Sequence, residues 1–83
     1  MVKYIVSEQL VGREVITTDG FDIGKLVDLE IDEMTGKLTH ILVDPNGDSE
    51  FVKKLPQKAG VLQVSYNSVI AVNDFIMVDR KGF

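Results

Sequence analysis

Apolar and polar residues alternate with a period of two along three neighbouring stretches of the chain, and glycine-containing turns separate these stretches. The first stretch spans residues 14–17. Asp19 and Gly20 follow it as a hairpin turn, because glycine adopts the positive φ that other residues resist. Residues 21–32 and 37–44 form the second and third stretches. This pattern predicts a meander of three antiparallel strands, the beginning of a small β-barrel.

The second stretch contains Gly24, and a glycine inside a strand marks a bulge or a sharp bend. A further turn ends at Gly36. Between these two glycines, apolar residues alternate with acidic ones, which predicts one core face and one solvated face. The apolar set is Val27, Leu29 and Ile31, and the acidic set is Asp28, Glu30 and Asp32. The third stretch is apolar on both faces, as in a central strand or one covered by an interface.

The C-terminal half predicts fewer and shorter elements. Residues 44–60 predict a loop with one short extended or helical piece, because Pro56 excludes a central strand there. Residues 61–65 return to a strand pattern, and 66–69 predict one helical turn that caps the barrel. The last pair of strands covers residues 70–72 and 75–79. A short leading strand at 3–7 and a helical turn that begins at Ser7 complete an all-β barrel of about six strands with one or two short helical turns.

Composition limits the class of protein. A length of 83 residues leaves no room for a second core, which predicts one domain over residues 1–83. The formal net charge of −4 argues against a protein that follows nucleic-acid phosphates. With no cysteine, neither disulfides nor thiolate metal sites are available, and an intracellular setting is compatible with that. No stretch approaches the ~20 apolar residues of a membrane span, so we expect a cytoplasmic protein that reaches a membrane only through a partner.

The order and spacing of these turns and strands resemble the PRC-barrel domain family over residues 12–79. The resemblance rests on GREV at 12–15, the Asp19-Gly20 turn, IGKLVD at 23–28, the turn that ends at Gly36, and VSYNSVIAVNDFIMV at 64–78. Two positions depart from the family pattern: Ser65 stands where proline is frequent, and Asn73 where glycine is usual. Asparagine is the next best residue for a left-handed turn. In length and in its loop, the chain is similar to the stand-alone archaeal members.

The resemblance implies a compact antiparallel barrel that binds proteins and has neither catalytic residues nor a cofactor. Family members include the cytoplasmic part of the photosynthetic reaction-centre H subunit and the C-terminal half of a ribosome maturation factor. Some archaeal members look like cell-division adaptors bound to the membrane anchor of the division ring. The first hypothesis is therefore an adaptor, for which the resemblance implies archaeal cell division. The alternative is a ribosome-assembly accessory factor that binds a basic ribosomal protein, without direct contact to nucleic acid.

One loop carries the basic cluster of this acidic chain. The cluster consists of Lys53, Lys54 and Lys58, with Phe51 and Leu55 as apolar neighbours. It is either a solvated loop or a docking loop for an acidic partner or lipid headgroups. At about 1 kcal/mol each, three lysines are too few to hold a protein on a membrane by themselves.

A second candidate surface is apolar. Five residues offer more apolar area than one small barrel needs, and they are Leu38, Leu42, Tyr66, Phe75 and Met77. They form either ordinary core or a self-association surface. A surface of the second kind predicts a twofold homodimer, or association with related barrels.

Candidate catalytic and metal-binding residues are sparse. His40 is the sole histidine, so the ligands of a zinc site cannot be assembled from one chain. No nucleophile motif such as G-x-S-x-G is present, and we expect His40 to be a partly exposed strand residue. The stretch DPNGDSEF at 44–51 resembles a calcium loop, but Ser49 stands where glycine is needed and Leu55 where a bidentate glutamate belongs. This stretch therefore predicts a polar turn.

The acidic residues of the second stretch raise one further alternative, which is an enzyme. Carboxylates at alternate strand positions lie about 7 Å apart, within the range of the paired acids of glycosidases. Such pairs work in a cleft, and a barrel of this size has no room for one. The acidic set and Glu33 therefore predict a solvated face that resists edge-to-edge aggregation. An enzyme or a metal-dependent sensor is the third hypothesis.

Overall fold

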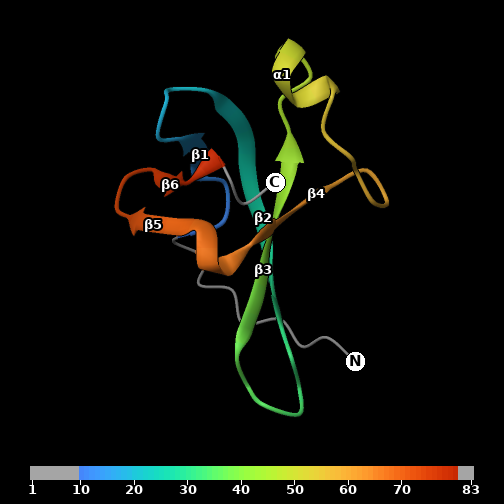
Figure 1. Ribbon diagram of the computed structural model, residues 1–83, viewed down its shortest axis with the longest axis vertical. Coiled ribbons are helices and arrows are strands. Elements are labelled where there is room, and N and C mark those ends of the chain that lie inside the picture. The colour runs from blue at the N-terminus through green and yellow to red at the C-terminus, as the bar shows by residue number, and fades with distance from the viewer. Residues whose placement is uncertain (1–9, 81–83) are drawn as a thin grey trace.

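The computed structural model describes residues 10–80, which form one six-stranded sheet with two short helices (Figure 1). The leading strand expected at 3–7 and the turn at Ser7 lie outside these residues. The elements in chain order are β1 (Glu14–Thr17), β2 (Asp22–Ile31), β3 (Leu38–Pro45), α1 (Glu50–Lys53), β4 (Leu62–Ser65), the 3₁₀-helix η1 (Tyr66–Ser68), β5 (Val69–Val72) and β6 (Ile76–Val78). The six strands agree with the expected number of about six, η1 is the helical turn expected at 66–69, and the short piece expected within 44–60 is helical as α1.

The sheet is mixed and open. Its strand order is β4-β3-β2-β1-β6-β5, and every neighbouring pair is antiparallel except β1 and β6. The fully antiparallel prediction is therefore wrong for one pair, in which Val15 pairs with Ile76 and Thr17 with Val78. The pair is parallel because η1 carries the chain across to the far side of β1, where β5 and β6 form a hairpin. The outermost strands, β4 and β5, do not pair within residues 10–80, so the sheet is not closed into a barrel.

Two predicted turns are confirmed. Gly20 lies between β1 and β2 with a φ of 94°, and its N–H donates to the Thr17 carbonyl oxygen at 3.0 Å. Gly36 lies between β2 and β3 with a φ of 72°, and its N–H donates to the Asp32 carbonyl oxygen at 2.7 Å. Asn73 is different. It is not among the positive-φ residues of the described chain, and its side-chain oxygen instead accepts the Phe75 N–H at 3.1 Å. The β5–β6 turn therefore does without a left-handed residue at this position.

Gly24 marks a β-bulge, as its position inside a strand predicts. Val15 pairs with Gly24 while Ile16 pairs with Asp22, so Ile23 is an extra residue on β2. A Cβ atom at Gly24 would lie 1.9 Å from the carbonyl oxygen of Asp44. This distance is far below any van der Waals contact, so no residue with a side chain fits at this position. Glycine is therefore required here for the close approach of β3 as well as for its φ of 143°.

A second bulge corrects the predicted face pattern of β2. Leu26 pairs with Val43 and Asp28 with Leu42, so Val27 is an extra residue. Because one inserted residue reverses the alternation of a strand, Val27 points outward and is 39% exposed. Ile31 is buried, as predicted. Val27 therefore does not share the core face on which it was expected.

The core lies inside the curved sheet and is closed at one end by α1. It is formed by ten buried apolar residues: Val15, Ile23, Leu26, Ile41, Val43, Val52, Leu62, Val64, Ile76 and Val78. Val52 is the contribution of α1. The Ser49 side chain caps this helix by accepting the Val52 N–H at 3.3 Å. Residues 49–55 are thereby fixed against the sheet, and this positions the basic loop.

Candidate functional site

The predicted docking residues gather where α1 leads into β4. Lys53 ends α1 and Lys54 caps it, while Lys58 lies in the tight turn before β4. All three lysines are exposed, and Leu55 is half-buried against the core. The Lys53 Nζ lies 3.3 Å from Glu50 Oε1, one turn earlier on the same helix. The structure thus brings the three lysines and Leu55 to one region. The charged ends of the lysines lie at the surface, and Leu55 packs toward the core.

Phe51 is half-buried and packs against another aromatic ring. Its ring lies against Phe21, with ring centroids 4.9 Å apart. The Arg80 guanidinium stands 4.5 Å from the Phe51 ring centre and 5.1 Å from that of Phe21. This stack fastens α1 to the start of β2 and to the C-terminal end of the described chain. Sequence reasoning missed it because its three members belong to different elements, and no local pattern links them.

A carboxylate holds the arginine of this stack in place. Arg80 Nη1 lies 2.8 Å from Asp19 Oδ2, and the Thr17 hydroxyl donates to Asp19 Oδ1 at 2.6 Å. The Thr17 hydrogen bond, followed by the interaction with Arg80, lowers the pKa of Asp19 below its usual 3.8. Asp19 is therefore ionised at neutral pH, as a partner of Arg80 must be.

A small apolar hollow lies beside the basic loop. Its volume is about 40 Å³, and its walls are Leu55, Pro56, Leu62 and Gln63. The first two belong to the loop and the last two to β4, so the hollow connects the loop to the outer strand of the sheet. It offers space for a small apolar group directly next to the exposed lysines.

The five residues of the predicted self-association surface do not lie together. Leu38 and Tyr66 line one apolar hollow of about 120 Å³, along with Ile41. Leu42 alternates with the buried Ile41 and therefore points to the opposite face of β3. Phe75 and Met77 lie at the β5–β6 hairpin, where Phe75 is 46% exposed and Met77 is half-buried. Of the five residues, Leu38 and Tyr66 therefore line the same hollow.

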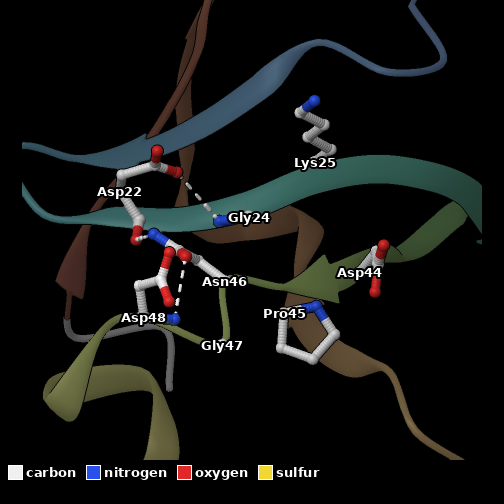
Figure 2. Close-up of a pocket in the computed structure, with 8 residues that line it drawn as sticks. All are labelled: Asp22, Gly24, Lys25, Asp44, Pro45, Asn46, Gly47 and Asp48. Atoms are coloured by element: carbon white, nitrogen blue, oxygen red, sulfur yellow. Dashed lines mark hydrogen bonds between the residues drawn. The ribbon is translucent and has the colours of Figure 1, made fainter.

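A polar hollow of about 440 Å³ lies between the start of β2 and the turn after β3 (Figure 2). Asp22, Asn46 and Asp48 gather on one side of it, and Asp44 lies apart. The Asp22 side chain accepts the Gly24 N–H at 3.1 Å, and the Asn46 side chain accepts the Asp48 N–H at 3.1 Å. These oxygens hold the backbone of a polar turn. Within residues 10–80, no three histidine, aspartate or glutamate side chains are grouped to hold a metal ion.

The acidic face of β2 is less solvated than expected. Glu30 is 16% exposed in its side chain, and its Oε1 accepts from Gln63 Nε2 at 3.2 Å. His40 Nδ1 lies 3.2 Å from the same oxygen, and the histidine side chain is 41% exposed. His40 is thus the partly exposed strand residue that was expected. Glu30 on β2 is thus shielded from solvent by His40 on β3 and Gln63 on β4.

The order of strands and turns defines a small all-β domain, and comparison with known proteins gives its family. A sequence model of the PRC-barrel domain family matches residues 5–82, so the chain belongs to this family. An uncharacterized protein of Methanocaldococcus jannaschii is 31% identical over 70 residues, which cover 84% of this chain and 75% of that relative. PRC-barrel domains are small non-catalytic domains that mediate protein–protein interactions. Between residues 10 and 80, no helix has the length and apolar character needed to cross a bilayer.

Proposed function

We propose that this protein is a non-enzymatic adaptor that binds another protein through residues 51–58. The observation that carries the proposal is the gathering of three exposed lysines beside the half-buried Leu55, on a chain whose net charge is −4. Family membership supports a binding role, because PRC-barrel domains mediate protein–protein interactions. Binding residues lie on loops more often than in cores, and α1 fixes this loop on the sheet.

The charge of the loop indicates an acidic partner. Lys54 and Lys58 make no ion pair with any other residue in the range 10–80, so both charges are available to a partner. Charge complementarity of this kind steers the encounter, whereas an apolar group such as Leu55 adds contact area once the partner is in place. Phe51 contributes indirectly, because its stack with Phe21 and Arg80 holds the helix that presents the lysines.

The cellular setting that we propose follows the family resemblance. The adaptor works in the cytoplasm and reaches a membrane only through its partner. Its process is cell division in an archaeon, with the membrane anchor of the division ring as the bound protein. The similarity to a Methanocaldococcus jannaschii protein supports an archaeal setting.

A ribosome-assembly role is the second candidate. The net charge of −4 favours it, since an acidic domain suits a basic ribosomal protein as partner. Co-sedimentation with small ribosomal subunits separates this role from the division role. A chain that stays at the top of the gradient rules out the ribosomal role.

Self-association is a further part of the proposal. The apolar hollow at Leu38 and Tyr66 is the surface on which a second copy or a related barrel would dock. Leu42, Phe75 and Met77 lie elsewhere, so they are peripheral to such a contact. A monomer mass, measured by light scattering at every concentration of a dilution series, would rule out self-association.

The adaptor proposal is tested by quantitative capture from native cells. In the loop variant, Lys54→Glu and Lys58→Glu are combined with Leu55→Ala. The matched control carries Lys25→Glu, Lys37→Glu and Val27→Ala, which change two exposed lysines and one exposed apolar residue elsewhere. We expect the loop variant to lose about tenfold or more of its captured partner, since hot-spot truncations exceed 1.4 kcal/mol. The control is expected to keep its partner. Full capture by the loop variant, with its fold intact by circular dichroism, contradicts the proposal.

A further inference from the structure

We propose that Asn46 is a site of spontaneous deamidation, and that its isoaspartate product loosens the connection from β3 to α1. The chain reads Pro45, Asn46, Gly47 and Asp48 at this point, in the turn that lines the polar hollow of Figure 2. Asparagine is a thermolabile residue, because the backbone nitrogen that follows it can attack its side-chain amide. The inference concerns a covalent modification and does not depend on the adaptor function.

The reaction needs no enzyme and no reactant other than water. The nitrogen of Gly47 attacks Cγ of Asn46, so that an N–Cγ bond forms and the Cγ–Nδ2 bond breaks. The side-chain nitrogen leaves as ammonia, with the proton that Gly47 gives up, and a cyclic succinimide remains. Water then opens the ring at either carbonyl. Opening at one carbonyl gives aspartate, and opening at the other gives isoaspartate, in which the main chain runs through Cβ and Cγ.

The attacking nitrogen of Gly47 is accessible in this fold. The residue is exposed, and its N–H makes no hydrogen bond to any residue between 10 and 80. A Cβ atom built on Gly47 would have nothing within 4 Å, so the space around its backbone is open. Glycine also reaches more backbone conformations than other residues, and this permits the rotation that brings its nitrogen onto the Asn46 side chain.

The hydrogen bonds of the Asn46 side chain favour the attack. Its oxygen accepts the Asp48 N–H at 3.1 Å, and this draws electron density away from Cγ. Its Nδ2 donates to the Asp22 carbonyl oxygen at 3.4 Å. This distance is longer than the usual hydrogen bond of about 2.7–3.2 Å, so the leaving group is weakly held. The carbon that is attacked is thus activated, while the nitrogen that must leave is nearly free.

Isoaspartate at position 46 changes the hydrogen bonds that join β3 to α1. In the intact chain, the Asn46 N–H donates to the Ile23 carbonyl oxygen at 3.0 Å, and the Asn46 carbonyl accepts the Ser49 N–H at 3.2 Å. In isoaspartate that carbonyl becomes part of a side-chain carboxylate, and the Cβ methylene lengthens the main chain. The new negative charge stands beside Asp22 and Asp48, and like charges repel. Because Ser49 caps α1, we expect the start of this helix to loosen.

The test follows the intact protein by peptide mapping and mass spectrometry during incubation in mildly alkaline buffer. Fragmentation by electron transfer distinguishes isoaspartate from aspartate. Asn73 is the internal control, because its side chain likewise accepts an N–H two residues ahead, that of Phe75, at 3.1 Å. The residue after it is Asp74 instead of glycine. We expect Asn46 to convert at least about tenfold faster than Asn73, with isoaspartate among the products.

A variant separates the succinimide route from direct hydrolysis of the amide. Gly47→Ala is expected to keep the fold, since nothing lies within 4 Å of its Cβ position, and to slow conversion of Asn46 about tenfold. Equal conversion of Asn46 and Asn73, or an unchanged rate in Gly47→Ala, overturns the deamidation site.

The effect on α1 is measured on the deamidated protein, separated from the intact protein by its extra negative charge. Hydrogen exchange followed by NMR is expected to show faster exchange of the Ser49 amide, because its acceptor has left the main chain. The Val43 amide, in the buried part of β3, serves as the control and is expected to change little. An unchanged Ser49 amide overturns the effect on α1.

Discussion

At the scale of single residues, the chain is most tightly constrained where two strands approach each other. Gly24 has no Cβ, and this allows the carbonyl of Asp44 to come close to β2. At this position β2 is paired on both sides, because Gly24 lies opposite Val15 of β1 and opposite Pro45 of β3. A single missing side chain therefore permits both pairings of the central strand.

Gly24→Ala is expected to destabilise the fold by about 3 kcal/mol or more. The added methyl group would lie 1.9 Å from a backbone oxygen, and alanine resists a φ of 143°. Chemical denaturation measures the change in the free energy of unfolding. Gly47→Ala is the control, because nothing lies within 4 Å of its Cβ position. Equal stabilities of the two variants would contradict this account of the bulge.

At the scale of elements, the connection from α1 to β4 determines where the lysines lie. Ser49 begins α1, and the turn at residues 58–61 ends the connection with two consecutive positive φ values. These are 54° at Ala59 and 79° at Gly60, the conformation of a tight hairpin turn of type I′. Alanine is strained in it, because its Cβ crowds the carbonyl in the left-handed region.

Ala59→Asn is expected to raise the free energy of unfolding by about 0.5 kcal/mol. Asparagine tolerates the left-handed region, and Asn-Gly is the favoured pair in this turn type. Thermal denaturation detects the gain as a higher Tm. The control is Ala71→Asn in β5, where φ is not positive and no gain is expected. A lower Tm for Ala59→Asn would show that the turn is not strained.

The sequence predicts local elements better than it predicts the way they combine. Gly20, Gly24 and Gly36 identify two turns and a bulge, because glycine has a specific conformational use at each place. Val27 has no such signature, so the second bulge and its outward side chain could not be foreseen. The parallel pairing of β1 with β6 joins opposite ends of the chain, and no local pattern encodes it.

In the candidate site as well, local features could be predicted from the sequence, and contacts between distant elements could not. The lysines and Leu55 could be found from the sequence, because a basic cluster stands out in an acidic chain. The stack of Phe51 with Phe21 and Arg80 could not, since it depends on tertiary packing. The hollow shared with Leu62 likewise exists only because the loop folds back beside β4.

At the scale of the whole molecule, the two edges of the open sheet have different surroundings. One edge, β4, begins beside the basic loop and its small hollow. The other edge, β5, lies near the apolar hollow that Val72 and Tyr66 help to line. We propose that the protein binds its partner at the basic loop beside β4 and a second copy at the apolar hollow near β5.

The most direct measurement is crosslinking with mass spectrometry on the tagged protein captured from its native cells. A lysine-reactive reagent reports on Lys53, Lys54 and Lys58 in the loop and on Lys25 and Lys37 elsewhere. We expect crosslinks to one recurring partner from the loop lysines, at acidic segments of that partner. Partner crosslinks that come from Lys25 and Lys37, with none from the loop, would contradict the central claim.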